Sequence, residues 1–494
     1  MMAELLFNPG TWTALAVLAA AYYHFFLRSP ALPFPPANKS ASELQDASSL
    51  ITNSLSKSNG GPVVVTLASG GRKILLPSSL AAWVKTNRDL DHQQLVREDF
   101  MSGIPGFEGS TLLHQSGSPI MDIIKTRMGL NDGTLRTLNA SVKRTLHDTL
   151  GEGAEWHAID WYAGTSNIIA RAASSVFVGP EKADDPEWLE LAQTYVTAYF
   201  TGVAELGTYP AWARSIVHWF LPNVKTCRKL LPRARVIIGQ VAAAREKEAA
   251  AARREGRPAP EYNDALEWVR AVSGGEVDPA EAQLCLAMAA FFTTAELLRV
   301  LLIEVARYPE YVDELREEIS TQISKHGLSV AGINGMVLLD SFMKESQRLN
   351  SGPVVLERVA LRDTALPDGR IIPRGSHIMV DSMDLWKSEK YPDPNKFDGR
   401  RFLKKREAGD SASQFVQSGP DYHVFGGGRH ICPGRFFASQ ELKLIMAHLL
   451  LKYDVRLGEG CDPKVIPNGF FVMIDPTVKF EVKRRKSGDA DALL

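Results

Sequence analysis

Apolar residues recur at helical spacing through most of the middle of the chain. Between Thr134 and about Leu349 they fall three or four positions apart, which places them on one face of a helix. Within this region, Leu284 to Val305 (LCLAMAAFFTTAELLRVLLIEV) is apolar almost throughout and predicts one long buried helix. Another apolar helical run covers Phe436 to Leu451. Helices therefore dominate the predicted fold.

Strand-like runs flank this helical region. Residues 37–119 mix short alternating runs with turns, and residues 381–417 are irregular and rich in Pro, Asp, Lys and Gly. Glycine- or proline-containing turns divide the strand-like runs into two pairs. These runs are Pro62 to Leu67, Arg72 to Leu76, Val354 to Leu361 and Ile371 to Val380. The predicted fold class is mainly α with a smaller β portion.

The N-terminus carries an apolar segment of a different kind. Residues 11–27 (TWTALAVLAAAYYHFFL) hold no charged residue and are long enough for a short membrane span. Because Arg28 and Lys39 follow the segment, the positive-inside bias places the rest of the chain in the cytosol. The alternative is a cleaved signal peptide, which small residues at 19–21 would suit. The apolar run continues past them and no basic residue precedes it, so an uncleaved anchor is favoured.

These features divide the chain into three parts. Residues 1–28 are the predicted transmembrane anchor, and residues 29–40 are a hinge stiffened by four prolines. Residues 41–494 form the main body, in which no long Gly/Ser linker and no internal repeat marks a further boundary.

Composition narrows the classes of function. The 494 residues carry a net charge of -1, which argues against nucleic acid as a partner because that role calls for a clustered basic face. The 4 cysteines are far apart and form no CxxC pair or metal-binding spacing. A reducing compartment is therefore favoured over a disulfide scaffold.

One loop, Phe425 to Gly434 (FGGGRHICPG), places a cysteine directly before the last apolar helix. Three successive glycines lack a Cβ, so a large flat group could approach the backbone there. Helix-terminal amides and Arg429 are expected to keep the Cys432 sulfur ionised. These properties fit haem iron held by a cysteine thiolate. The alternative is a glycine-rich turn with a buried cysteine.

The loop resembles the haem-binding signature of the cytochrome P-450 superfamily. Two earlier features stand in the order that this family shows: a Glu-x-x-Arg pair at Glu345 and Arg348, and Phe397-Asp398-Gly399-Arg400-Arg401-Phe402 after it. The wording of these motifs is similar to that of filamentous-fungal microsomal enzymes of secondary metabolism. The resemblance implies the cytochrome P-450 fold, with residues 41–494 as a haem-binding catalytic domain.

The resemblance also implies the residues that hold the cofactor, haem b. Cys432 would be the axial ligand of the iron, while His430, Arg358 and Arg429 would hold the haem propionates. Phe425 and Gly428 would shape the loop around the cofactor. Glu345, Arg348 and Arg401 would form a buried ion network behind the haem, and loss of one member would cost on the order of 3–5 kcal/mol.

The long apolar helix would lie over the haem. Ala290 matches the small residue that makes room for O2, and Thr293 matches the threonine whose hydroxyl bonds the bound oxygen. Phe292 occupies the position at which the family carries a proton-relaying acid, and a phenyl ring carries no proton. A threonine in a helix can instead bond back to its own helix. The predicted substrate pocket is apolar, and its candidate residues are Met288, Phe291, Phe292, Val354, Val355 and Phe471.

The function implied is that of a single-pass endoplasmic-reticulum monooxygenase with a cytosolic catalytic domain. It would oxidise a lipophilic secondary-metabolite intermediate of the terpenoid, polyketide or alkaloid type. Electrons would come from NADPH through cytochrome P-450 reductase, with cytochrome b5 as a further candidate donor. Two alternatives stay open: rearrangement, dehydration or coupling without oxygen insertion, which Phe292 suggests, and a non-catalytic haem carrier or sensor.

Overall fold

The computed structural model describes residues 13, 32–69, 71–115, 117–129, 131–468, 470–486 and 494. The predicted anchor at residues 1–28 lies outside the described residues except for Thr13. Among the described residues, one helix is long and apolar enough to cross a membrane, and it is the mostly buried helix at Pro279–Arg307.

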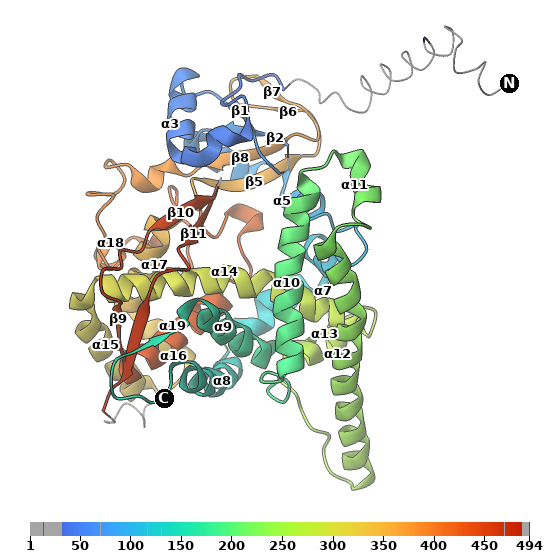
Figure 1. Cartoon of the computed structure of the whole chain (residues 1–494), viewed down its shortest axis with the longest axis vertical. Helices are drawn as coiled ribbons and strands as arrows, with labels where there is room; N and C mark the ends of the chain where they lie inside the picture. The colour runs from blue at the N-terminus through green and yellow to red at the C-terminus, as the bar shows by residue number, and fades with distance from the viewer. Residues whose placement is uncertain are drawn as a thin grey trace, which may run out of the picture.

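Helices make up most of the described chain, as the sequence predicted (Figure 1). The longer ones are α3 (Ala47–Lys57), α8 (Asp132–Leu150), α9 (Trp161–Phe177), α10 (Pro186–Gly207), α12 (Pro222–Arg254), α13 (Ala265–Ser273), α14 (Pro279–Arg307), α15 (Val312–His326), α17 (Val337–Leu349) and α19 (Arg435–Lys452). The shorter ones are α4 (Ala81–Thr86), α5 (His92–Asp99), α6 (Thr111–His114), α7 (Pro119–Ile123), α11 (Ala211–Val217), α16 (Val330–Gly335) and α18 (Arg401–Glu407).

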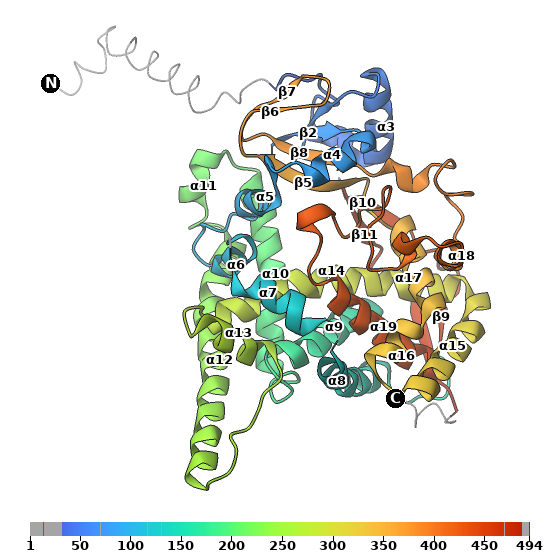
Figure 2. The ribbon, with the colours of Figure 1, turned by 180° about the vertical axis from the view of Figure 1, so that it is seen from behind.

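Helix α14 crosses the middle of the molecule, with other helices on both sides of it (Figures 1 and 2). Its first turn is fixed locally, because Pro279 occupies the first turn and the Asp278 side chain accepts from the amides of Ala280 and Glu281. Apolar residues surround the helix on most sides, and most of them are buried in the main core. The predicted long buried helix at residues 284–305 is therefore confirmed.

The β portion is confined to small sheets. The largest contains β1 (Val63–Thr66), β2 (Arg72–Leu76), β3 (Leu90–Asp91), β5 (Val354–Ala360) and β8 (His377–Asp381) in the order β1-β2-β8-β5-β3. The others are β4 (His157–Ile159) with β12 (Phe480–Arg484) and β9 (Tyr453–Leu457), β6 (Thr364–Ala365) with β7 (Ile371–Ile372), and β10 (Val465–Asn468) with β11 (Phe471–Ile474). The five-stranded sheet joins chain segments about three hundred residues apart, since Ile74 pairs with Ile378.

Two sequence expectations about this region need correction. The hairpin at β1 and β2 is confirmed, but residues 37–119 also contain α3, α4, α5 and α6, which the alternating pattern did not indicate. The predicted strand from Ile371 to Val380 is two strands, because the turn at Gly375, with φ of +77°, separates β7 from β8.

Candidate active site

The loop that precedes α19 has a backbone shape that requires its glycines. The amide of Cys432 donates to the carbonyl of Phe425 at 2.8 Å and closes the loop. Gly426 and Gly428 have φ of +75° and +63°. A Cβ on Gly428 would lie 2.5 Å from the carbonyl oxygen of Lys85 on α4. The loop therefore packs against α4 at a distance that only glycine allows.

Cys432 is half-buried at the end of this loop. Burial raises the pKa of its thiol, while the amides of Gly434 and Arg435 and the Arg435 guanidinium act in the opposite direction. Arg435 also donates to the carbonyl of Cys432 at 2.8 Å. The cation beside the sulfur is thus Arg435, and the expectation that Arg429 fills this place is wrong. Arg429 instead donates to His430 and to the carbonyls of Arg88 and Leu90.

Arg358 on β5 is a buried cation that forms no ion pair with another described residue. Its side chain is 2% exposed, and it donates to the carbonyls of Glu357 at 2.7 Å and Gly427 at 3.4 Å. Its Nε has no hydrogen-bond partner among the described residues. Burial lowers the pKa of Arg358 to about 10. Because buried charges are normally paired, this guanidinium fits an anion that the protein itself does not provide.

Two histidines lie beside Arg358. Burial and the Arg358 charge lower the pKa of His430 to about 4, so its ring is neutral at pH 7. Its Nε2 accepts from Arg429 at 2.7 Å, which leaves Nδ1 as the donor. The ring of His92, at the start of α5, lies 6.0 Å from that of His430. His92 was not predicted from the sequence, because no motif surrounds it and only the pairing of β3 with β5 brings it here.

The middle of α14 exposes one face. Thr293, Phe292 and Ala289 are exposed and Ala290 is half-buried, although the helix is otherwise buried. Phe292 is 44% exposed, and its ring centroid lies 6.1 Å from that of Phe200 on α10. The Thr293 hydroxyl donates to the carbonyl of Ala289 at 3.0 Å. Because Thr293 and its two neighbours on this face are exposed, a molecule could reach Thr293 there.

The predicted pocket residues do not share one environment. Met288 and Phe291 are buried in the main core, and the Phe291 ring lies parallel to that of Phe177 at 6.4 Å. These two have a packing role, in contrast to exposed Phe292. Val354 and Val355 are half-buried at the start of β5. Phe471 belongs to β11, but its side chain lies outside what the structure describes.

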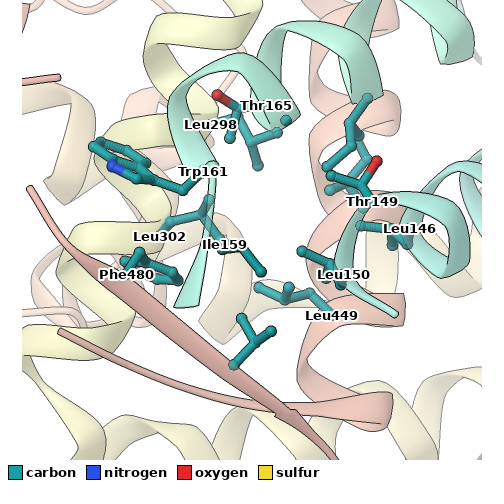
Figure 3. A pocket seen from close by; sticks show the side chains of 14 residues that line it. Leu146, Thr149, Leu150, Ile159, Trp161, Thr165, Leu298, Leu302, Leu449 and Phe480 are labelled. Carbon is teal, nitrogen blue, oxygen red and sulfur yellow. The ribbon is translucent and has the colours of Figure 1, made fainter. Parts of the chain in front are cut away.

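A separate pocket lies deeper in the helical core (Figure 3). It is enclosed by side chains of α8, α9, α14 and α19 and of the edge of the small sheet, including Leu146, Trp161 and Leu302. None of the predicted site residues lines it. We therefore assign it to imperfect packing of the core.

Glu345, Arg348 and Arg401 form the buried ion network that the motifs predicted. Arg348 donates to both carboxylate oxygens of Glu345 at 2.8 and 2.9 Å, and Arg401 donates to the same carboxylate at 2.9 Å. Arg348 and Glu345 are completely buried. The terminal guanidinium nitrogens of both arginines also donate to backbone carbonyls of residues 385–396. The network thus fastens α17 to the irregular segment that leads to the cysteine loop.

These observations fit a haem with a thiolate ligand. The loop offers a sulfur beside a glycine backbone, Arg358 offers a buried guanidinium whose Nε has no partner among the described residues, and His430 offers the N–H of its Nδ1. Cys432 would hold the iron, and Arg358 and His430 would bind the two carboxylates at the edge of the macrocycle. Arg429, which holds His430, would contribute by fixing the orientation of that ring.

Comparison with known proteins supports the same assignment. Residues 261–483 match the family model described as cytochrome P-450. The chain is 36% identical over 424 residues to cytochrome P-450 monooxygenase 1 of Gibberella fujikuroi, covering 84% of this chain and 96% of that protein. It is 34% identical over 446 residues to cytochrome P-450 monooxygenase pyr3 of Aspergillus fumigatus, covering 89% of this chain and 85% of that protein.

A solved structure extends the comparison to the fold. The chain of a retinoic-acid-bound cyanobacterial cytochrome P-450 matches 92% of this chain with a TM-score of 0.66 and 18% identity, and all of that chain is covered. At this identity the match concerns the fold alone. The fungal relatives, at 36% and 34% identity, establish that this chain belongs to the cytochrome P-450 family and is a monooxygenase of that family.

Proposed function

We propose that this monooxygenase hydroxylates or otherwise oxidises a lipophilic secondary-metabolite intermediate of the terpenoid, polyketide or alkaloid type. The observation that carries the proposal is the exposed face of α14, where the apolar side chains of Ala289 and Phe292 adjoin the hydroxyl of Thr293. An apolar wall with a single polar group suits a substrate that is held mainly by burial of apolar surface. The similarity to fungal monooxygenases supports the same class of chemistry.

The bound haem would supply the activation of O2. Cys432 would hold the iron from the side of the loop, and Arg358 and His430 would fix the edge of the macrocycle. Ala290 leaves space beside the helix because its side chain is a single methyl group. The Thr293 hydroxyl now donates to the carbonyl of Ala289, but a rotation about its Cα–Cβ bond would let it donate a hydrogen bond away from the helix.

Cytosolic redox partners and a membrane position complete the proposal. Electrons would come from NADPH through cytochrome P-450 reductase, with cytochrome b5 as a further donor. An apolar surface around α11 supports attachment to the endoplasmic-reticulum membrane: Trp212, Ile216, Trp219 and Phe220 are 46%, 60%, 55% and 79% exposed. Contiguous exposed apolar side chains of this size are typical of a membrane or protein contact. Tryptophan suits the membrane interface in particular.

Two measurements test the proposal. The reduced, CO-bound spectrum of the wild type is expected to show the strongly red-shifted Soret band of a thiolate-ligated haem, and Cys432→Ala should lose it. Cys461→Ala, which changes another half-buried cysteine outside the site, should keep it. Incubation with candidate lipophilic compounds, reductase, NADPH and ¹⁸O2 should then place one labelled atom in the product.

Rearrangement without oxygen insertion is the second candidate function, and Phe292 favours it because a phenyl ring replaces the acid next to Thr293. A product free of the label, formed only in the presence of the enzyme, would establish this alternative. Haem binding with thiolate ligation but no turnover of any compound would point to a carrier or sensor.

A further inference from the structure

Monooxygenation consumes protons, and the α14 face has no acid at position 292. The reaction converts substrate C–H, O2, two electrons and two protons into C–OH and H2O. Thr293 can pass on a proton only if its hydroxyl receives another proton in return. Another group near Thr293 must therefore connect it to water.

Glu296 is the acid on the same face of the helix. It follows Phe292 by four residues and Thr293 by three, and these spacings bring side chains together on a helix surface. Its side chain is half-buried, with 15% of its surface exposed. The Cβ atoms of residues three apart on a helix are about 5–6 Å apart, a gap that two extended side chains or one water molecule can bridge.

The two carboxylate oxygens of Glu296 have different surroundings. Oε1 is paired with the guanidinium of Arg299 and lies 3.5 Å from the hydroxyl of Tyr162 on α9. Oε2 is buried and has no hydrogen-bond partner among the described residues. A buried carboxylate oxygen without a partner is costly, which indicates that this atom has a partner in the working enzyme.

Helix α9 holds Arg299 in place. Arg299 is 2% exposed and donates to Thr165 Oγ1 at 3.0 Å, to the carbonyl of Tyr162 at 2.8 Å and to Ser166 Oγ at 2.5 Å. Its guanidinium carbon also lies 3.6 Å from the centre of the Tyr162 ring. A cation fixed in this way keeps one oxygen of Glu296 bound and stabilises the carboxylate after its other oxygen has given up a proton.

We propose that Glu296 is the proton relay of this enzyme and replaces the acid that is missing at position 292. Oε2 takes up a proton from the solvent and passes it to the oxygen of the Thr293 hydroxyl, directly or through one water molecule. The hydroxyl passes its own proton towards the reaction. The transfer leaves Glu296 as the carboxylate paired with Arg299, and the next proton again comes from the solvent. The electrons come from the reductase and do not pass through these side chains.

The inference rests on the role proposed for Thr293, and Glu296→Gln tests it. Glutamine keeps the size of the side chain and an oxygen for Arg299, but it cannot release a proton under these conditions. Glu304→Gln is the matched control, because Glu304 is also a buried residue of α14 paired with an arginine three residues later, Arg307. Glu304 is buried and lies about two turns beyond Glu296.

General acid–base groups typically contribute about 10²–10⁴-fold to a rate, and water can replace part of that. We therefore expect product formation in Glu296→Gln to fall at least tenfold, with more hydrogen peroxide released per NADPH consumed. Haem content, the CO spectrum and the thermal midpoint should stay at the level of Glu304→Gln. Glu296→Asp, which keeps an acid, should lie between Glu296→Gln and the wild type.

A readout that needs no substrate separates proton transfer from structural support. In infrared difference spectra of the holoenzyme, recorded on reduction with dithionite, a carboxyl band that shifts in D2O should be present in the wild type and in Glu304→Gln. It should be absent in Glu296→Gln. If Glu296→Gln does not retain haem, the wild-type band and Glu296→Asp decide: a wild type without a D2O-sensitive carboxyl band overturns the proposal.

Thr293→Ala separates this inference from the function on which it rests. Loss of coupling in Thr293→Ala but full coupling in haem-retaining Glu296→Gln would overturn the relay and leave the role of Thr293 intact. Full coupling in Thr293→Ala would instead overturn both, because the relay acts through that hydroxyl.

Discussion

Replacing Glu345 with Gln should separate the folding role of the buried ion network from the chemistry of the site. Glu345 accepts two hydrogen bonds from Arg348 and one from Arg401, and it also accepts from the amide of Asp398 at 3.2 Å. Glutamine has nearly the same shape, so the substitution removes the negative charge and one acceptor without opening a cavity. Two buried guanidinium groups are then left without a counter-charge.

The expected cost follows from the burial of these groups. Breaking a buried ion pair by removing one partner costs about 3–5 kcal/mol, because the remaining charge stays desolvated. The arginines keep their bonds to backbone carbonyls, including 2.6 Å from Arg401 to Pro392 and 2.7 Å from Arg348 to Pro394. These bonds place the cost near the lower end of that range, about 3 kcal/mol.

The assay is thermal unfolding of the holoenzyme together with haem retention, measured by the CO spectrum. A matched control is Glu267→Gln, which breaks another pair at i,i+3 spacing, to Arg270, in which the arginine side chain is 68% exposed. That change should cost less than about 0.5 kcal/mol. A Glu345→Gln enzyme that unfolds within one degree of the control would refute the assignment of this network to stability.

Three further predictions follow from other contacts. Gly428→Ala should abolish haem binding, since its Cβ would lie 2.5 Å from the Lys85 carbonyl oxygen. The control is Gly460→Ala, at a residue with φ of +71° and open space around it. This change should cost only about 1–2 kcal/mol of unfolding free energy and keep the CO spectrum. Lys344→Met should lower the free energy of unfolding by at least about 3 kcal/mol, because Lys344 Nζ donates to three backbone carbonyls of residues 412–417 and each buried carbonyl left unpaired costs about 1–3 kcal/mol. Faster proteolysis of that segment checks this prediction. Burial acts to lower the pKa of His377, but hydrogen bonds to Asp99 and Glu98 outweigh it and raise the pKa to about 9. The contact between α5 and β8 should therefore be at full strength below about pH 6.5 and be lost as the pH rises through about 9, and the difference in urea midpoint between wild type and His377→Gln should shrink over that range.

Sequence motifs predicted the parts of the site that are local in the chain. Cys432 and its glycines lie within ten residues, and Glu345 and Arg348 lie one helical turn apart, so their geometry follows from a loop and a helix. The long helix α14 was predicted for the same reason. The contact of Arg401 with Glu345 came from the order of motifs in a known family and could not come from spacing.

What the sequence could not predict depends on distant pairing. His92 meets His430 only because β3 pairs with β5, and Arg435 rather than Arg429 lies beside the sulfur only because of the turn that ends the loop. Periodicity also failed on α14 itself. A helix that is apolar on nearly every side does not reveal which face stays open, so Phe291 and Phe292 looked equivalent, although one is buried against Phe177 and the other is exposed.

The exposed face of α14 would serve two requirements of the proposed reaction, binding of a lipophilic substrate and delivery of protons. Phe292 extends the apolar wall towards α10, which favours a lipophilic substrate but removes the acid beside Thr293. Glu296 lies one turn further on and is paired with Arg299, which donates three hydrogen bonds to α9. A negative charge is therefore stabilised at Glu296, whereas the apolar wall would not stabilise one. In this proposal, one helical turn separates the substrate wall from the proton route. Phe292→Asp should therefore weaken the binding of a lipophilic substrate and should restore coupling to Glu296→Gln, an outcome that a purely structural role of Glu296 does not predict.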